Sequence, residues 1–453
     1  MQSANAFLGT IVLGALLVGC GGRYATSEDL LSLPTRPPSP VDADSLLASQ
    51  GEASDPVDLE GAIALVLGHN PELRAAAEQV LATDAGRVQT HAWDNPELLV
   101  DLEGIGGDRR GFRQTEVTVA LGMPVDVFGK RGTRIRVAEA EVEATRARFV
   151  ETRRQLVAQT RLAFHKVLAA QELLRISMDR FRATEETAVA TARQVDAGKV
   201  PPLHQIRAEV AREAARSRVE SARALVQAAR LELASLWGAA DASVKGSLRS
   251  TTPQIDRSSL ADLLLASNPR LLEALWIAER QRRHRDRISR ERMPDVTPAL
   301  GVRWLTESGH QDFVAGVAIG LPILDRKAAA MTAAERTHAA SLAKVEAIRR
   351  ELLAELTLVL QRLDEATTRF QAYVSEIVPR AQEALDLART GYEGGKFGYL
   401  ELLDAQNTFI DVESGRADAL IALDQALTRL EGLFDHAMDE TMPLDSPNKR
   451  KTP

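Results

Sequence analysis

The chain has 453 residues, and its content of 45% hydrophobic and 26% charged residues is sufficient to bury a core. Aromatic residues make up only 4%, which favours long, closely packed helices over a compact aromatic core. The formal net charge of −7 argues weakly against nucleic acid as the main partner.

The first 20 residues have the pattern of a lipoprotein signal peptide. An apolar run over residues 11–19 precedes Cys20, the single cysteine, and is too short for a membrane span. Leu17-Val18-Gly19-Cys20 resembles a bacterial lipobox, so Cys20 is expected to carry the lipid. An ordinary signal peptide with a chance cysteine is the alternative. Residues 1–6 contain no Lys or Arg, so the usual basic n-region is missing or the start codon is misassigned. Residues 21–56, rich in Pro, Ser and Asp, predict an extended tether.

An internal duplication organises the rest of the chain. Asn70-Pro71 recurs 198 residues later as Asn268-Pro269, and Gly198-Lys199 recurs 197 residues later as Gly395-Lys396. We therefore expect a first repeat over residues 57–237, a connector over 238–258, a second repeat over 259–438 and a disordered tail over 439–453.

Each repeat is predicted to begin with helix and to continue with two strands. Helical periodicity runs over residues 57–91, around Asn70-Pro71. Apolar and polar side chains then alternate over residues 96–106 and 112–122, and again over residues 295–305 and 312–321. Strands of this length with one apolar face can cross a bilayer in a tilted barrel, although two soluble hairpins are the alternative. Four strands cannot close a barrel, so three chains sharing one would supply about twelve.

A very long helix is predicted after each pair of strands. Residues 128–196 contain no proline and carry apolar residues every seven positions, with one stutter. At about 1.5 Å per residue this helix would be roughly 100 Å long. The chain returns as a helix after Pro201-Pro202. The second repeat predicts a long helix over residues 324–391, kinked at Pro379, and a return helix over residues 400–438.

Glycine-rich segments mark the two hairpin tips. In the second tip, Gly394, Gly395 and Gly398 interrupt the helical pattern, and Glu401 and Asp404 follow on one face of the next helix. Repeated around a threefold axis, these carboxylates would form a negative ring that attracts cations. The alternative is a solvated helix start, where acidic residues favour the helix dipole.

The order and spacing of these motifs resemble the TolC-type outer-membrane efflux proteins, most closely their CzcC-like cobalt–zinc–cadmium branch. The resemblance is carried by N-P-E-L at 70–73, by Gly122-Met123-Pro124 followed by F-G-K-R at 128–131, and by G-G-K-F-G-Y-L-E-L-L-D-A-Q at 394–406. It implies a mainly helical homotrimer, with long antiparallel hairpins forming a tunnel and four transmembrane strands per chain forming a shared barrel. It also implies an outer-membrane location, a periplasmic adaptor protein and a proton-driven inner-membrane pump of the resistance-nodulation-division type. The exported cargo would be heavy-metal cations.

The resemblance also assigns roles to the tips. Tyr392, Glu401 and Asp404 match the family's periplasmic gate. The expected adaptor-docking residues at the two tips are Gly198, Lys199, Pro201, Gly395, Lys396 and Phe397. Phe397 stands where many relatives have an arginine, so an arginine-based tether of the gate is not expected here.

Two other functions remain open at this point. A duct of the same architecture could export organic drugs or peptides, and a lipid-anchored periplasmic coiled-coil scaffold would have no pore. Neither a catalytic arrangement nor a metal or cofactor motif stands out, because the eight histidines are scattered. The arginine-rich run over residues 280–292 is interpreted as a solvated helix end rather than a nucleic-acid site.

Overall fold

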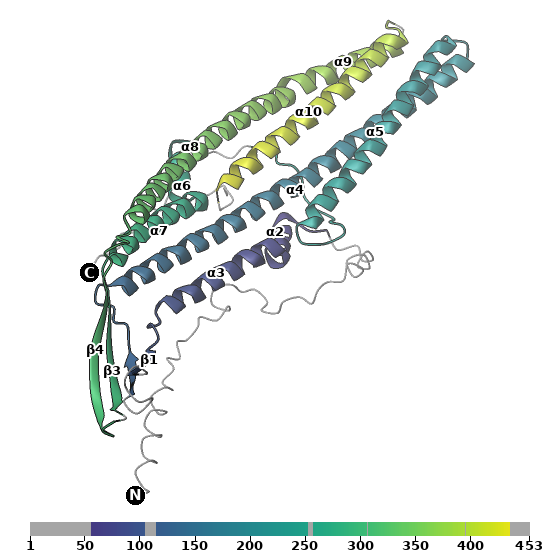
Figure 1. The fold of residues 1–453 in the computed structure, drawn as a ribbon. Coiled ribbons are helices and arrows are strands. Elements are labelled where there is room, and N and C mark those ends of the chain that lie inside the picture. Colours follow the sequence, from purple (N-terminus) through teal and green to yellow (C-terminus); the bar gives the residue numbers. More distant parts are fainter. Residues whose placement is uncertain (1–55, 105–114, 252–256, 306, 395, 435–453) are drawn as a thin grey trace. The chain divides into compact units, whose positions relative to one another are not determined.

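The computed structural model describes residues 56–104, 115–251, 257–305, 307–394 and 396–434. Cys20, Gly395, the tail over 439–453 and nearly all of the tether lie outside these ranges. The described residues are mostly helical, with one small sheet, as the sequence predicts (Figure 1). The helices are α2 (Leu59–His69), α3 (Pro71–Thr90), α4 (Lys130–Asp196), α5 (Pro202–Ser235), α6 (Arg257–Ser267), α7 (Pro269–Glu291), α8 (Ala328–Ala372), α9 (Val378–Glu393) and α10 (Tyr399–Leu433), with a π-helical turn, η3 (Tyr373–Ile377), between α8 and α9.

The duplicated Asn-Pro motif is a helix start. Asn70 accepts hydrogen bonds from the backbone N–H of Glu72 and Leu73, at 2.9 and 3.3 Å. Asn268 caps α7 in the same way, and each following proline occupies the first helical position, where no N–H is needed. The helical segment over residues 57–91 is consequently two helices, α2 and α3, and not one.

Four antiparallel strands form the sheet in the order β1-β2-β3-β4. They are β1 (Glu97–Glu103), β2 (Glu116–Gly122), β3 (Asp295–Leu305) and β4 (Gln311–Gly320). The two hairpins of the two repeats join through β2 and β3, with Val119 opposite Val302. Large apolar side chains on the sheet are exposed, including Leu98 at 68% and Phe313 at 96%. Among the described residues, the sheet therefore has two open edges, β1 and β4, and exposed apolar side chains.

The long helices form two antiparallel hairpins, α4 with α5 and α8–α9 with α10 (Figure 1). α4 packs against α3, α5, α7 and α10, and α8 packs against α6, α7 and α10. One apolar cluster joins α6, α7, α8 and α10 around Leu264, Leu363 and Leu423. A second joins α2, α4 and α5 around Val167 and Leu233. Each such buried leucine or valine contributes about 1.5–3 kcal/mol to folding.

The second long helix is interrupted, unlike the first. η3 ends two residues before Pro379, so the disturbance expected at this proline takes the form of a π turn. Across this turn the N–H of Val378 donates to the carbonyl of Tyr373. The Tyr373 ring lies against Gly415 of α10, where an added Cβ would be 2.4 Å from the tyrosine Oη. Only glycine at position 415 leaves room for this side chain.

Candidate functional site

The first hairpin tip closes with backbone hydrogen bonds at the end of α4. Gly198 has a φ of +67°, a left-handed conformation that glycine adopts without strain. Its N–H donates to the carbonyl of Val195, and the N–H of Lys199 donates to the carbonyl of Gln194, each at 2.9 Å. Pro201 precedes α5 in an extended conformation. Gly198, Lys199 and Pro201 are all exposed at this tip.

The second tip closes around Gly391. The N–H groups of Lys396 and Phe397 both donate to the carbonyl of Gly391, at 2.8 and 3.1 Å. The Phe397 ring lies over the same glycine, because a Cβ added there would be 2.1 Å from the ring. Lys396 and Phe397 are nevertheless exposed, the latter at 48%. Gly395, the remaining predicted docking residue, lies outside the described residues.

Tyr392 connects the second tip to the first long helix. The side-chain Nε2 of Gln194 donates to the Tyr392 hydroxyl oxygen at 2.6 Å. The contact ties α9 to α4, that is, the second repeat to the first. Sequence reasoning missed Gln194, and nothing local distinguishes it from the other polar residues of that helix. The sequence feature that could have pointed to Gln194 is its position four residues before Gly198, close to the first tip.

Glu401 and Asp404 lie in the first turns of α10 and are both exposed. The Glu401 carboxylate lies close to the backbone of Gly398, where an added Cβ would be 2.7 Å from Oε2. In the part of the chain that the structure describes, neither carboxylate takes part in an ion pair. The structure thus places both acids near the second tip, exposed and three residues apart on α10.

Two further contacts join α4 to α10, at positions before the first tip in α4 and after the second tip in α10. The Thr187 hydroxyl lies 3.5 Å from Oε1 of Gln406, and Arg180 forms an ion pair with Asp411 at 3.0 Å. Any movement of α10 relative to α4 must break or remake these contacts.

A buried polar cluster also joins α4 to α10. Asp424 is fully buried on α10, and its Oδ1 accepts from the N–H and the Nε of Arg249, at 3.1 and 3.0 Å. Its Oδ2 lies 2.7 Å from Nδ1 of His165 on α4. Burial raises the pKa of Asp424, but the hydrogen bonds and charges of His165 and Arg249 outweigh it and hold the pKa below its usual value. The cluster joins α4, the connector and α10. Its sequence signal is an aspartate within the apolar run that includes Leu423 and Leu427, which sequence reasoning missed.

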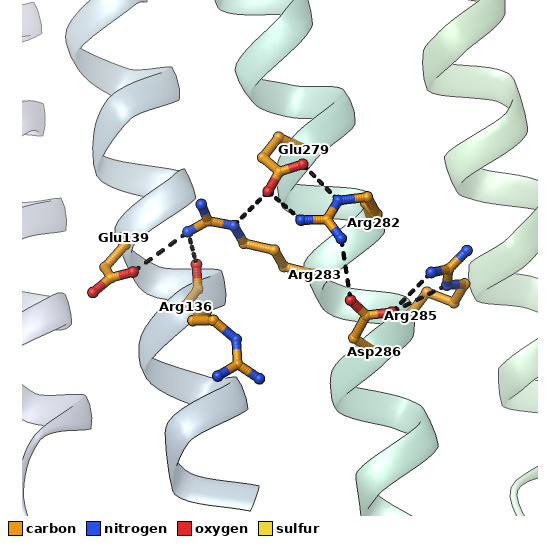
Figure 2. A network of polar contacts seen from close by, with 7 residues as sticks. All are labelled: Arg136, Glu139, Glu279, Arg282, Arg283, Arg285 and Asp286. Atoms are coloured by element: carbon orange, nitrogen blue, oxygen red, sulfur yellow. Dashed lines mark hydrogen bonds and ion pairs between the residues drawn. The ribbon is translucent and has the colours of Figure 1, made fainter. Parts of the chain in front are cut away.

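The arginine-rich run ends α7 shortly before β3, as the sequence predicts, and several of its arginines form a network of ion pairs (Figure 2). Arg283 on α7 donates to the carbonyl of Arg136 on α4 at 2.8 Å and forms an ion pair with Glu139 at 3.4 Å. Glu279 accepts from Arg282 and Arg283, both at 2.7 Å, and these bonds lower its pKa to about 2. The network therefore connects the two repeats near the sheet.

Within the described ranges, no group of three or more His, Cys, Asp or Glu side chains could hold a metal ion. The same residues include no helix that is long and apolar enough to cross a bilayer.

Comparisons with known proteins agree with the geometry. A family model described as outer membrane efflux protein matches residues 62–239 and 260–434. The chain is 32% identical over 394 residues to the cobalt-zinc-cadmium resistance protein CzcC of Cupriavidus metallidurans, covering 84% of this chain and 91% of CzcC. It is 30% identical to the nickel-cobalt-cadmium resistance protein NccC of Alcaligenes xylosoxydans xylosoxydans, over 62% of this chain and 64% of NccC. Its fold is similar to that of the outer-membrane channel OprN, with a TM-score of 0.71 and 19% identity over 83% of this chain and 89% of that chain.

Proposed function

The chain belongs to the outer membrane efflux protein family, and on this premise we propose that it is the outer-membrane duct of a tripartite system that exports heavy-metal cations. The predicted family is thereby confirmed, and its structural neighbours are channel proteins, not enzymes. The duct would be passive, so the choice of cargo would lie with the inner-membrane pump and its adaptor.

The similarity to CzcC carries the metal assignment. At 32% identity over 84% of the chain, it extends well beyond the tip motifs. Export of drugs or peptides by the same architecture is the alternative to be tested. The scaffold without a pore gains no support, because it gives no role to four strands with exposed apolar side chains.

A homotrimer accounts for the open edges of the sheet. Three copies of the four strands would give about twelve strands, enough to close a barrel around a water-filled lumen. Closure would also pair the edge amides of β1 and β4, which lipid cannot solvate. Lipidation of Cys20 would add an anchor to the same membrane.

The second tip is the proposed gate. Three copies of Glu401 and Asp404 would place six exposed carboxylates around one axis, a ring that attracts cations. The hydrogen bond between Gln194 and Tyr392 would hold α9 against α4 in the closed state. The exposed residues of both tips, among them Lys199, Lys396 and Phe397, would meet the adaptor.

A growth-inhibition panel tests the cargo. A strain that lacks this chain but keeps the pump and adaptor is compared on zinc, cobalt and cadmium salts and on dyes, detergents and antibiotics. We expect selective sensitivity to the metals, restored by the intact chain. Selective sensitivity to the organic compounds would replace the metal assignment by drug efflux. Conductance of the purified protein in a planar bilayer separates a pore from a scaffold.

A further inference from the structure

A cavity of about 170 Å³ lies between α8 and α10, which run side by side in the second hairpin (Figure 1). We call it the α8–α10 cavity. Its small lining residues, Ala366, Ala422 and Ala426, are buried or half-buried and leave space between the longer side chains. Because a water molecule takes up about 30 Å³ in the liquid, the cavity has room for a small ion together with water.

The charges around this cavity are unbalanced. Arg362 and Arg369 of α8 and Arg429 of α10 line it, and all three are exposed. Within the described ranges none of these arginines forms an ion pair, and neither does Glu365, the acid that lines the same cavity. Each chain therefore carries an excess of positive charge here. Guanidinium groups bind carboxylate and phosphate oxygens through paired hydrogen bonds, so the arginines suit an oxyanion.

The cavity opens on one particular face of α10. Between residues 412 and 433, the exposed residues of this helix are Asp418, Gln425 and Arg429. At about 100° per residue, these three lie within about 40° of one another around the helix. Asp404, which belongs to the proposed gate, lies within about 20° of Arg429 by the same measure. The proposed gate and the cavity consequently share one face.

The other side of this hairpin is covered by the connector and by α6. An arginine of the connector is bound to Asp424, about 140° around α10 from Arg429. An arginine of α6 is bound to Asp364, about 140° around α8 from Arg369. Because a passage must stay open, the lumen of a duct would border the uncovered face, which also carries Asp404.

We propose that the α8–α10 cavity is an oxyanion site in the wall of the tunnel, formed by Arg362, Arg369 and Arg429. Its place at the lumen rests on the proposed function. The tunnel then changes sign along its length, from acidic at Glu401 and Asp404 to cationic at this level. A bound phosphate or carboxylate neutralises the arginines, which otherwise repel the metal cations that pass them.

Calorimetric titration of the purified full-length protein in detergent tests the site. Inorganic phosphate and citrate are the two probes, each titrated at constant ionic strength in a chloride buffer. We expect saturable binding of at least one probe, and at least tenfold weaker binding when Arg362→Gln, Arg369→Gln and Arg429→Gln are combined. Arg349→Gln is the matched control and should bind as the intact protein does. Arg349 is exposed on α8, has no ion pair among the described residues, and lies about 140° around the helix from Arg362.

The two probes also identify the ligand. Tighter binding of phosphate assigns the site to a compact inorganic anion, and tighter binding of citrate assigns it to a polycarboxylate. Each single variant should weaken binding by a smaller factor, which keeps the test independent of the stability of the combined variant. Absence of saturable binding of both probes would overturn the site, as would unchanged affinity in the single and combined variants.

Ion selectivity tests the place of the site in the tunnel. In a planar bilayer with a potassium chloride gradient, phosphate should shift the reversal potential of the intact channel towards the value for cations. The combined variant should already show this shift without phosphate and should not respond to it. Equal reversal potentials of the intact channel with and without saturating phosphate would overturn its place in the tunnel wall.

The site and the proposed function fail separately. A channel that confers metal resistance but binds neither probe would refute the site and leave the function intact. A protein that binds a probe through the three arginines, but whose loss changes no metal sensitivity, would refute the function and leave the binding site intact.

Discussion

The two helical hairpins share one ancestry and one length but differ in continuity. In the first repeat α4 runs unbroken from Lys130 to Asp196. In the second repeat the corresponding helix is interrupted by η3 and Pro379, and the hairpin ends in the glycine-rich tip that carries the proposed gate. We infer from this difference that the first hairpin would serve as the fixed support of the proposed gate, and that the second would bend at η3.

The largest expected effect comes from the buried tie between the hairpins. Asp424→Ala removes the carboxylate partner of His165 and one of the two carboxylates that Arg249 binds, Glu431 being the other, which should destabilise the protein by about 3 kcal/mol. Thermal unfolding in detergent measures the loss. Asp418→Asn, an exposed acid on the same helix, is the control and should change the midpoint little. Equal stability of the two variants would mean that the cluster does not hold the hairpins together.

The next largest effect is expected at η3, the π-helical turn that interrupts the second long helix. Gly415→Ala would drive a methyl group into the Tyr373 ring, so α8, η3 and α10 must shift, at a cost of about 1–3 kcal/mol. Gly86→Ala in α3 meets no neighbour and should be neutral or stabilising by up to about 1 kcal/mol. The two variants are compared by thermal unfolding and by channel conductance. A Gly415→Ala protein as stable as Gly86→Ala would contradict the packing at η3.

The hydrogen bond at the tip should have a smaller effect on stability and a visible one on the gate. Tyr392→Phe removes the acceptor for Gln194 and about 1 kcal/mol of closed-state stability. Single-channel recordings should then show more frequent opening. Gln194→Ala should act alike, and the double variant should open no more often than either single variant. Additive effects would show that the two side chains act independently.

The exposed acids should affect ion flow and not folding. Asp404→Asn should weaken block of the open pore by divalent cations, because it removes one negative charge per chain from the ring. Glu401→Gln should act in the same direction. Unchanged block in both variants would remove these residues from the gate.

The smallest effect is expected in the arginine network. The pKa of Glu279 is lowered to about 2, so its ion pairs contribute stability above the ordinary carboxyl pKa of about 4.5. That contribution is lost as the pH falls from about 4.5 towards 2. Glu279→Gln should therefore lower the unfolding midpoint slightly at pH 7 and flatten its dependence in the acidic range. A parallel pH profile in both proteins would contradict this role.

Local patterns predicted the elements well. Strand alternation around Val100 and Val302 located the two hairpins of the sheet, and the glycines near Lys199 and Lys396 located both tips. Glu401 and Asp404 could be singled out because they stand near the start of a helix, which the sequence pattern alone indicates.

Contacts between distant segments could not be predicted in this way. The packing of Tyr373 beside Gly415 and the hydrogen bond from Arg283 to α4 each bring together residues that are far apart in the chain. Asp424 is the intermediate case. Its position among buried leucines signals a satisfied buried charge, but His165 becomes its partner only once the two repeats are packed together.

Retention of metal by living cells tests the central claim most directly. Cells that lack this chain but keep its pump and adaptor are loaded with cadmium or zinc, transferred to metal-free medium, and assayed over time for cell-associated metal. We expect slower loss of metal than in cells with the intact chain. Equal loss of metal, together with retention of an organic dye, would contradict a metal duct.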